Sequence, residues 1–305
     1  MNANRIKGAL YGVAVGDALG APLEFMTAEQ IEKKFGKVTE MIGGGWLNVR
    51  PGEVTDDTQM SVAVAEGIVA NPDNPCGAVG LRFIEWLATG PKDVGNTCRS
   101  SILLARHALE DGQPNTAETW FHAAKRTAEA RGGFGSGNGA LMRTIYPAVY
   151  YRRAKDARRI ANDIGRMTHW DEESAQAIDL YTAMVHMLTK SDFRNIEDCE
   201  AQLSNTQYDE VELQYRDLAP TGYVVNSFGC ALQCCRKAHA FEEAVVMAAN
   251  LGGDSDTIAA ITGGLAGAYY GYDAIPQRWI DKLSSSLRAQ LDRLAAAAVE
   301  SRKEA

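Results

Sequence analysis

The sequence predicts an all-α protein with a single compact multi-helix domain, and three observations support this. Nearly every apolar segment repeats with a period close to 3.6 residues. No segment alternates as a half-buried strand would, and no repeat of fixed period is found. No Pro- or Ser-rich linker divides the 305 residues, of which 46% are hydrophobic. We therefore expect one domain over 1–305, with a charged tail at 300–305 that frays.

The expected helices begin where the apolar period starts and end where glycine interrupts it. In the first, Ile6, Leu10 and Val13 share one face, and the glycines at 16–20 end it. The glycine run at 132–139 precedes a helix that we expect to begin at Ala140. The other helices are expected at 60–69, 79–87, 97–109, 117–130, 156–167, 172–188, 224–239, 241–250, 257–270 and 283–299.

Composition excludes several classes of function. The net charge of −8 argues against general nucleic-acid binding, which needs a basic surface. The six cysteines form no CxxC pair, so neither a zinc ribbon nor a thioredoxin-type site is indicated. Cys230 and Cys234, one helical turn apart, fit small core residues. The N-terminus lacks the order of a signal peptide and no apolar run could span a membrane, so a reducing cytoplasm is expected.

Two Thr/Asp clusters, each after glycines and each opening an apolar helix, are the most unusual feature. As ordinary N-caps they would satisfy free helix N–H groups, but a cap needs one such residue. Adjacent carboxylates repel each other, which a cation would offset. Oxygen ligands with no Cys or His nearby suit Mg²⁺ or Mn²⁺, and up to four carboxylates would allow a two-metal site. The candidate ligands are Thr55, Asp56, Asp57, Asp254, Asp256 and Thr257.

Two further acidic positions have both a structural and a functional interpretation. Asp17 and Glu24 flank a glycine turn after the first helix. That turn is either a helix stop with a capping Asp, or it brings Glu24 to the metal site or to a substrate hydroxyl. Asp93 lies in a loop before a helix whose expected N-cap is Asn96 or Thr97, which leaves Asp93 without a structural role.

The glycine run and a lone histidine are weaker candidates on their residues alone. Consecutive backbone N–H groups around Asn138 could bind a phosphate at a helix start. The run lacks the Lys-Ser/Thr of a P-loop and the strand of a dinucleotide fingerprint. His169 follows a helix, where capping or packing is the commoner role. No Ser-His-Asp or Cys-His spacing stands out, so nucleophilic hydrolysis fits poorly.

Four motifs resemble, in order, those of the ADP-ribosylglycohydrolases. They are Gly16-Asp-Ala-Leu-Gly20, Thr55-Asp-Asp-Thr58, Gly137-Asn-Gly-Ala-Leu-Met-Arg143 and Gly252-Gly-Asp-Ser-Asp-Thr257. The segments 41–47, 51–52, 93–98 and 220–225 look like the dinitrogenase reductase-activating branch of that family. The resemblance covers about 6–283 and is weakest at 190–218. It implies an all-α fold with a binuclear Mg²⁺ or Mn²⁺ centre.

The resemblance also implies roles for individual residues. The six residues of the Thr/Asp clusters match the family's metal ligands, and Ser255 stands where Ala or Thr is common. Asp93 matches an acidic residue acting on the ribose, and Glu24 matches one near the metals and the ribose. His169 matches a histidine that lines the family's pocket. Gly137, Asn138 and Gly139 match the loop near the diphosphate.

The expected function is metal-dependent hydrolysis of the N-glycosidic bond between ADP-ribose and a protein arginine. By resemblance the target is the nitrogenase iron protein, with a PII-type signalling protein as regulator and membrane association only through a partner. Two alternatives stay open. The same centre would instead release ADP-ribose from serine or from a small molecule, or the protein would be a binding protein that has lost the chemistry.

Overall fold

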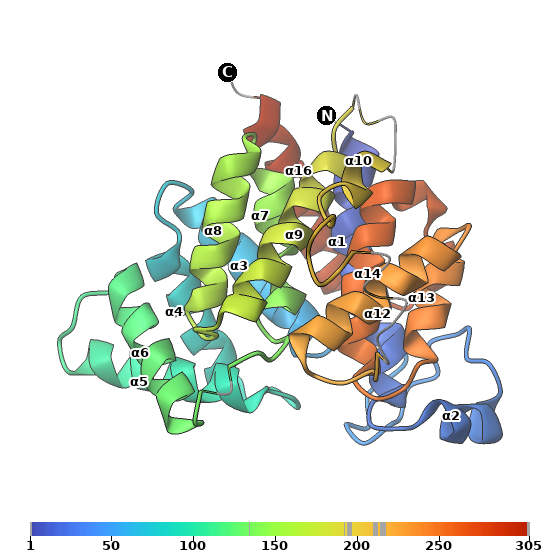
Figure 1. Ribbon diagram of the computed structural model, residues 1–305, viewed down its shortest axis with the longest axis horizontal. Helices are drawn as coiled ribbons and strands as arrows, with labels where there is room; N and C mark the ends of the chain where they lie inside the picture. The colour runs from blue at the N-terminus through green and yellow to red at the C-terminus, as the bar shows by residue number, and fades with distance from the viewer. Residues whose placement is uncertain are drawn as a thin grey trace.

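The computed structural model describes residues 2–133, 135–191, 193, 197–209, 213 and 218–303. Within them the elements are helices, and isolated bridges take the place of strands, so the predicted all-α domain is confirmed (Figure 1). The elements are α1 Ala3–Gly20, η1 Ala21–Leu23, α2 Ala28–Phe35, α3 Asp56–Ala70, α4 Cys76–Ala88, α5 Asn96–Glu110, α6 Ala117–Ala130, η2 Leu141–Arg143, α7 Ile145–Tyr150, α8 Ala154–Arg166, α9 Glu172–Leu188, α10 Glu197–Glu200, α12 Val224–Lys237, α13 Phe241–Ala249, α14 Ser255–Tyr270, η3 Tyr272–Ala274, α15 Gln277–Ile280 and α16 Ser285–Lys303.

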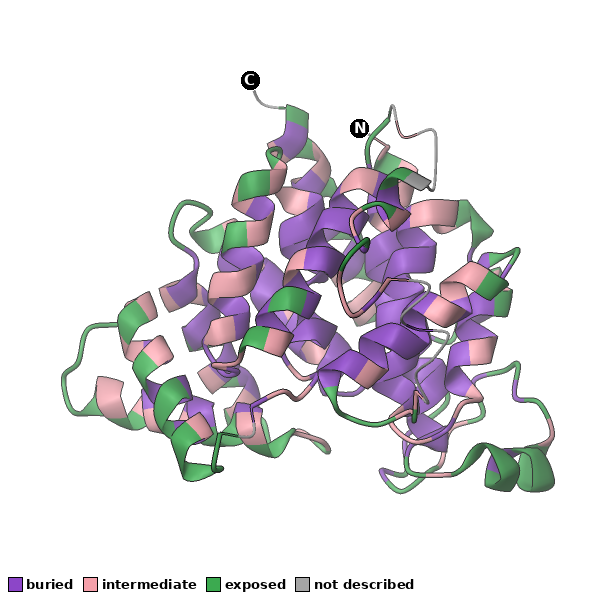
Figure 2. Cartoon of the chain, in the orientation of Figure 1, coloured by how far each residue is buried: buried purple, intermediate pink, exposed green. Residues whose placement is uncertain are grey.

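The core is built around α1 and α14, which lie side by side although they come from opposite ends of the chain (Figure 1). Both are buried over most of their length, as the purple ribbons of Figure 2 show. Neither helix therefore needs a polar face. α9, α12, α13 and α16 pack around this pair, and α3 connects it to α4.

Small residues spaced four apart allow α1 and α14 to approach very closely. A Cβ atom added at Gly12 would lie 2.0 Å from the backbone oxygen of Gly263, and one added at Gly16 would lie 2.0 Å from that of Ala259. The same holds at Gly8, with 2.4 Å to the oxygen of Gly267. Backbone thus packs directly on backbone, which fixes the distance between the two helices.

Several helices differ from the sequence-based expectation, and the largest differences are at Ala140, α2 and α3. No α-helix begins at Ala140: the chain first makes the short 3₁₀ helix η2, and α7 starts at Ile145. α2 was not expected, although Thr27 and Gln30 form a capping box that its sequence encodes. α3 begins at Asp56, four residues earlier than predicted, because the first Thr/Asp cluster is part of its first turn.

The C-terminal helix is fixed to the core by a buried arginine. Residues 300–303, where the sequence indicated fraying, continue α16, and Arg302 is buried. Its guanidinium donates to Thr189 Oγ1 at 3.1 Å and to His186 Nδ1 at 2.7 Å, and also contacts Ala148 O. Residues 304–305 lie outside the described residues.

Two other expectations concern the core and the membrane. Cys230 and Cys234 are buried free thiols, which confirms them as core residues. Among the described helices, none has the length and apolar character needed to cross a bilayer.

Candidate metal centre and active-site cavity

The first Thr/Asp cluster is held by Asp17, a buried residue in the last turn of α1. Its carboxylate accepts hydrogen bonds from the backbone N–H and the hydroxyl of Thr55, at 2.9 and 3.0 Å. It also accepts from the backbone N–H and hydroxyl of Thr58, at 3.0 and 2.5 Å. Asp17 therefore caps α3 from another helix, which leaves the carboxylates of Asp56 and Asp57 free for other partners.

The second cluster follows a loop that only glycine can form. Gly252 and Gly253 have positive φ, and a Cβ at Gly253 would lie 1.8 Å from Pro220 O. The N–H of Phe25 donates to Gly253 O at 2.7 Å, and that of Asp254 donates to Pro220 O at 3.0 Å. The loop is thereby fixed to the segment after η1 and to the one before α12, and it delivers Asp254 to the start of α14.

Neither cluster serves as an ordinary N-cap. Thr55 is the N-cap residue of α3 and Asp254 that of α14, and neither side chain makes a capping hydrogen bond. The expectation for the Asp93 loop is wrong in a similar way, because the N-cap of α5 is Gly95, not Asn96 or Thr97. The capping interpretation thus fails at all three acidic loops.

The two clusters meet face to face. Thr257 Oγ1 lies 3.2 Å from Asp57 Oδ2, and Thr55 Oγ1 lies 3.3 Å from Asp57 Oδ2 and 3.5 Å from Asp256 Oδ2. The second oxygen of Asp57, Oδ1, is buried and has no hydrogen-bond partner among the described residues. Such an atom carries a large desolvation cost, and carboxylate and hydroxyl oxygens in this arrangement fit a hard divalent cation.

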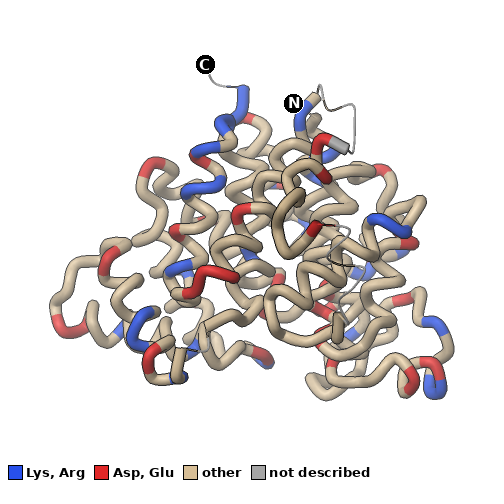
Figure 3. Tube along the Cα trace, viewed as in Figure 1, with Lys and Arg blue, Asp and Glu red and all other residues tan. Residues whose placement is uncertain are grey.

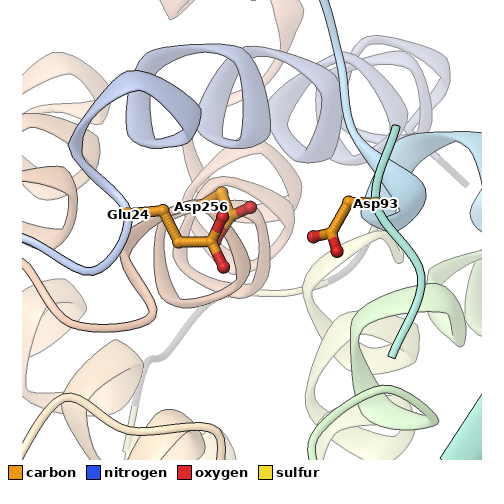
Figure 4. A group of neighbouring side chains, drawn as sticks. All are labelled: Glu24, Asp93 and Asp256. Carbon is orange, nitrogen blue, oxygen red and sulfur yellow. The ribbon is translucent and has the colours of Figure 1, made fainter. Parts of the chain in front are cut away.

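Two further carboxylates, those of Glu24 and Asp93, lie close to Asp256 of the second cluster. Oxygen atoms of Glu24, Asp93 and Asp256 all lie within 4.8 Å of one another. Figure 4 shows Glu24 and Asp256 next to each other, with the carboxylate of Asp93 facing them. Trp46 Nε1 donates to Glu24 Oε2 at 2.6 Å, and Asn138 Nδ2 donates to Asp254 Oδ2 at 2.7 Å.

The electrostatics of the cluster call for a positive charge. Burial, followed by the charges of Asp93 and Asp17, raises the pKa of Asp56 to about 8. Burial also raises the pKa of Glu24 to about 8, although the hydrogen bond from Trp46 opposes this. Burial and neighbouring carboxylates place the pKa values of Asp57 and Asp256 well above the usual range. A bound cation would stabilise the ionised carboxylates.

The glycine loop at 137–139 packs on His169. A Cβ at Gly137 would lie 3.1 Å from His169 Nε2, and one at Gly139 would lie 3.2 Å from its Cε1. Thr168 Oγ1 is 2.8 Å from His169 Nδ1, and burial lowers the pKa of His169 to about 3. A neutral imidazole can donate one hydrogen bond and accept another, so His169 is available to the cavity as a hydrogen-bonding group.

One cavity of about 680 Å³ unites these groups. The predicted site residues in its wall are Glu24, Asp56, Asp93, Gly137, Asn138, Gly139, His169, Asp254, Asp256 and Thr257. Thr55 and Asp57 are buried against them. The sequence-based list missed Trp46, Arg131 and the holding role of Asp17. The sequence could have indicated the role of Asp17, because a carboxylate inside an apolar helix of small residues needs buried hydrogen-bond partners.

Comparison with known proteins agrees with this geometry. The ADP-ribosylglycohydrolase family model matches residues 2–305. ADP-ribosyl-[dinitrogen reductase] glycohydrolase of Rhodospirillum rubrum is 33% identical over 302 residues, which cover 97% of both chains. ADP-ribosylarginine hydrolase Tri1 of Serratia proteamaculans is 29% identical over 92% of this chain and 75% of its own. A solved structure described as an ADP-ribosylglycohydrolase-related protein complex matches with a TM-score of 0.81 at 29% identity, covering 98% of both chains. The chain belongs to the ADP-ribosylglycohydrolase family.

Proposed function

We propose that the protein hydrolyses the N-glycosidic bond between ADP-ribose and an arginine side chain of a modified protein, with two divalent cations, Mn²⁺ or Mg²⁺. The observation that carries the proposal is the meeting of the two Thr/Asp clusters and two further acidic positions, Glu24 and Asp93, at one cavity. Two similar proteins whose names state activity on ADP-ribosylarginine or on dinitrogen reductase support it.

The six residues of the two clusters would hold the cations: Thr55, Asp56, Asp57, Asp254, Asp256 and Thr257. When bound, the ions would polarise the ribose hydroxyls and lower the pKa of a water molecule. Water oxygen forms a bond to the anomeric carbon, the carbon–nitrogen bond breaks, and a proton goes to the guanidine nitrogen. Asp93, half-buried opposite Asp256, would handle the proton transfers of this step or assist opening of the ribose ring.

Other residues position the substrate. Glu24, held by the indole of Trp46, orients ribose hydroxyls. Asn138 is fixed by Asp254 and by Ser227, whose Oγ accepts from it at 2.9 Å. Gly137 and Gly139 place backbone beside His169, and Arg131 adds a positive charge to the cavity wall for the diphosphate.

The test is release of ADP-ribose from arginine-modified protein, with and without Mn²⁺, for wild type and Asp93→Ala. We expect Mn²⁺-dependent release by wild type and a loss of at least about 10²-fold in the variant. Equal rates would remove Asp93 from the mechanism. Serine-linked and free ADP-ribosyl substrates, assayed in parallel, decide between the linkage types, and activity on none would favour a binding protein.

The target is a narrower proposal. By likeness to the Rhodospirillum rubrum protein, whose name states dinitrogen reductase, we propose the iron protein of nitrogenase as the target. The PII-type regulator and the cytoplasmic setting expected from the sequence stay predictions. Release of ADP-ribose from modified iron protein no faster than from an unrelated arginine-modified protein would count against this target.

A further inference from the structure

Two aromatic rings lie exposed at the mouth of the cavity. Phe25 is 68% exposed and Trp46 is 53% exposed, and both belong to the cavity wall. Their ring centroids are 5.3 Å apart at an angle of 44°. Ile42, in the same loop as Trp46, is 39% exposed. An apolar surface of this kind beside an acidic site is typical of a surface that binds another protein.

The backbone holds both rings in place. Phe25 has φ of 62°, an uncommon conformation for a residue with a side chain. Hydrogen bonds on either side enforce it, from Phe25 N to Gly253 O at 2.7 Å and from Gly253 N to Met26 O at 2.8 Å. Trp46 is fixed by its bond to Glu24. The rings are therefore exposed while rigidly connected to the Asp254 loop and to the active-site carboxylates.

The two rings form a solvent-exposed part of the cavity wall. At about 680 Å³, the cavity has the size of sites that enclose a whole small-molecule ligand. Its lining contains one Lys or Arg among the described residues, Arg131, which suits the diphosphate. The aromatic pair adjoins carboxylates instead, which favours an apolar or cationic neighbour over a phosphate. A polypeptide that carries the modified arginine extends outside the cavity and can present apolar or cationic side chains to the two rings.

We propose that Phe25 and Trp46 bind the polypeptide segment flanking the modified arginine, so that they select protein substrates over free ADP-ribosylarginine. The inference rests on the proposed function and adds its specificity determinant. Apolar side chains of the segment pack on the rings, and a flanking Lys or Arg can lie over a ring face.

The test compares kcat/KM for an arginine-ADP-ribosylated protein with kcat/KM for free ADP-ribosylarginine. Phe25→Asn removes the ring and keeps a residue type that tolerates positive φ. We expect the protein-to-small-molecule ratio to fall about tenfold, mainly through KM for the protein. Phe25→Tyr retains a ring and should restore the ratio. Leu81→Ala, at a 47% exposed position of α4 outside the cavity wall, is the matched control and should leave the ratio unchanged.

The outcomes separate the inference from the proposed function. An equal loss on both substrates would mean that the ring contacts ADP-ribose itself and would overturn the inference. No loss on either substrate would overturn it as well. A wild-type protein that releases ADP-ribose from neither substrate would overturn the proposed function, and the inference with it. A thermal midpoint of Phe25→Asn close to that of wild type confirms that the comparison concerns binding.

Discussion

Substitution of Gly12 by Ala tests whether the α1–α14 contact determines both the stability and the site. The new Cβ would lie 2.0 Å from Gly263 O, whereas ordinary contact begins at 3.4 Å. The helices would have to separate by roughly 1.4 Å, the difference between these distances. Overpacking in a tight core costs on the order of 1–3 kcal/mol, and backbone on both sides leaves little room for adjustment, so we expect about 3 kcal/mol.

The same displacement reaches the site. Asp17 lies five residues after Gly12 on α1 and holds the first cluster, while Asp256 lies on α14. A shift of about 1 Å between them would change the cluster geometry, for which a loss of roughly 10²-fold in rate is reasonable. We therefore expect Gly12→Ala to lower the thermal midpoint by roughly 6 °C or more and to reduce kcat sharply.

Thermal unfolding by circular dichroism and the ADP-ribose release assay measure the two effects. Ala296→Ser, at an exposed position of α16, adds one heavy atom as Gly12→Ala does and serves as the control. A midpoint within 1 °C of wild type for Gly12→Ala (threshold on the order of experimental error) would refute the claim that backbone contact sets the helix separation.

Three further predictions concern single side chains. Mn²⁺ should raise the thermal midpoint of wild type, by a stabilisation of about 2.7 kcal/mol when the free Mn²⁺ concentration is 100 times Kd. Asp57→Asn should abolish this rise. An equal rise in both proteins would contradict the metal assignment. Asp17→Asn replaces an acceptor of the Thr55 and Thr58 bonds by a donor, and urea unfolding should show a loss of about 2–4 kcal/mol. Burial lowers the pKa of His186 to about 4, whereas the pKa of a histidine in the unfolded chain is 6.5. The unfolded state therefore binds a proton first as pH falls, so the folded protein keeps its full stability above about pH 6.5 and loses stability as pH falls from 6.5 towards 4. Between pH 7.5 and 5.5 wild type should lose about 1 kcal/mol more than His186→Gln, and parallel losses would exclude this histidine as the cause.

The sequence predicted the long helices and most residues of the candidate site, because both leave local signals. Apolar period located the long helices, and paired acidic residues that exceed the needs of a cap identified Thr55–Asp57 and Asp254–Thr257. That these clusters meet did not follow from spacing alone, since nearly two hundred residues separate them. The structure places both in one site, as predicted.

The features that could not be predicted depend on tertiary contacts. The glycines at 132–139 were expected to open a helix, with a phosphate site at their backbone N–H groups as a weaker candidate. Their second task, to leave space for His169 beneath Gly137 and Gly139, is visible only once the chain is folded. Trp46 likewise has no local signal for its bond to Glu24, which joins segments 22 residues apart. Figure 3 shows Lys and Arg scattered among Asp and Glu over the described chain, so surface charge gave no further guide to the cavity.

The pairing of α1 with α14 has a consequence for synthesis on the ribosome. α1 is translated before the surface that covers it, Ser255–Tyr270, which begins 235 residues after Gly20. At about 5–20 residues per second, the N-terminal helix waits on the order of ten seconds or longer for its partner. During that interval the apolar side chains of α1 lack the helix that covers them in the folded protein. A nascent chain that stops before 254 has neither a closed core nor the second of the two Thr/Asp clusters.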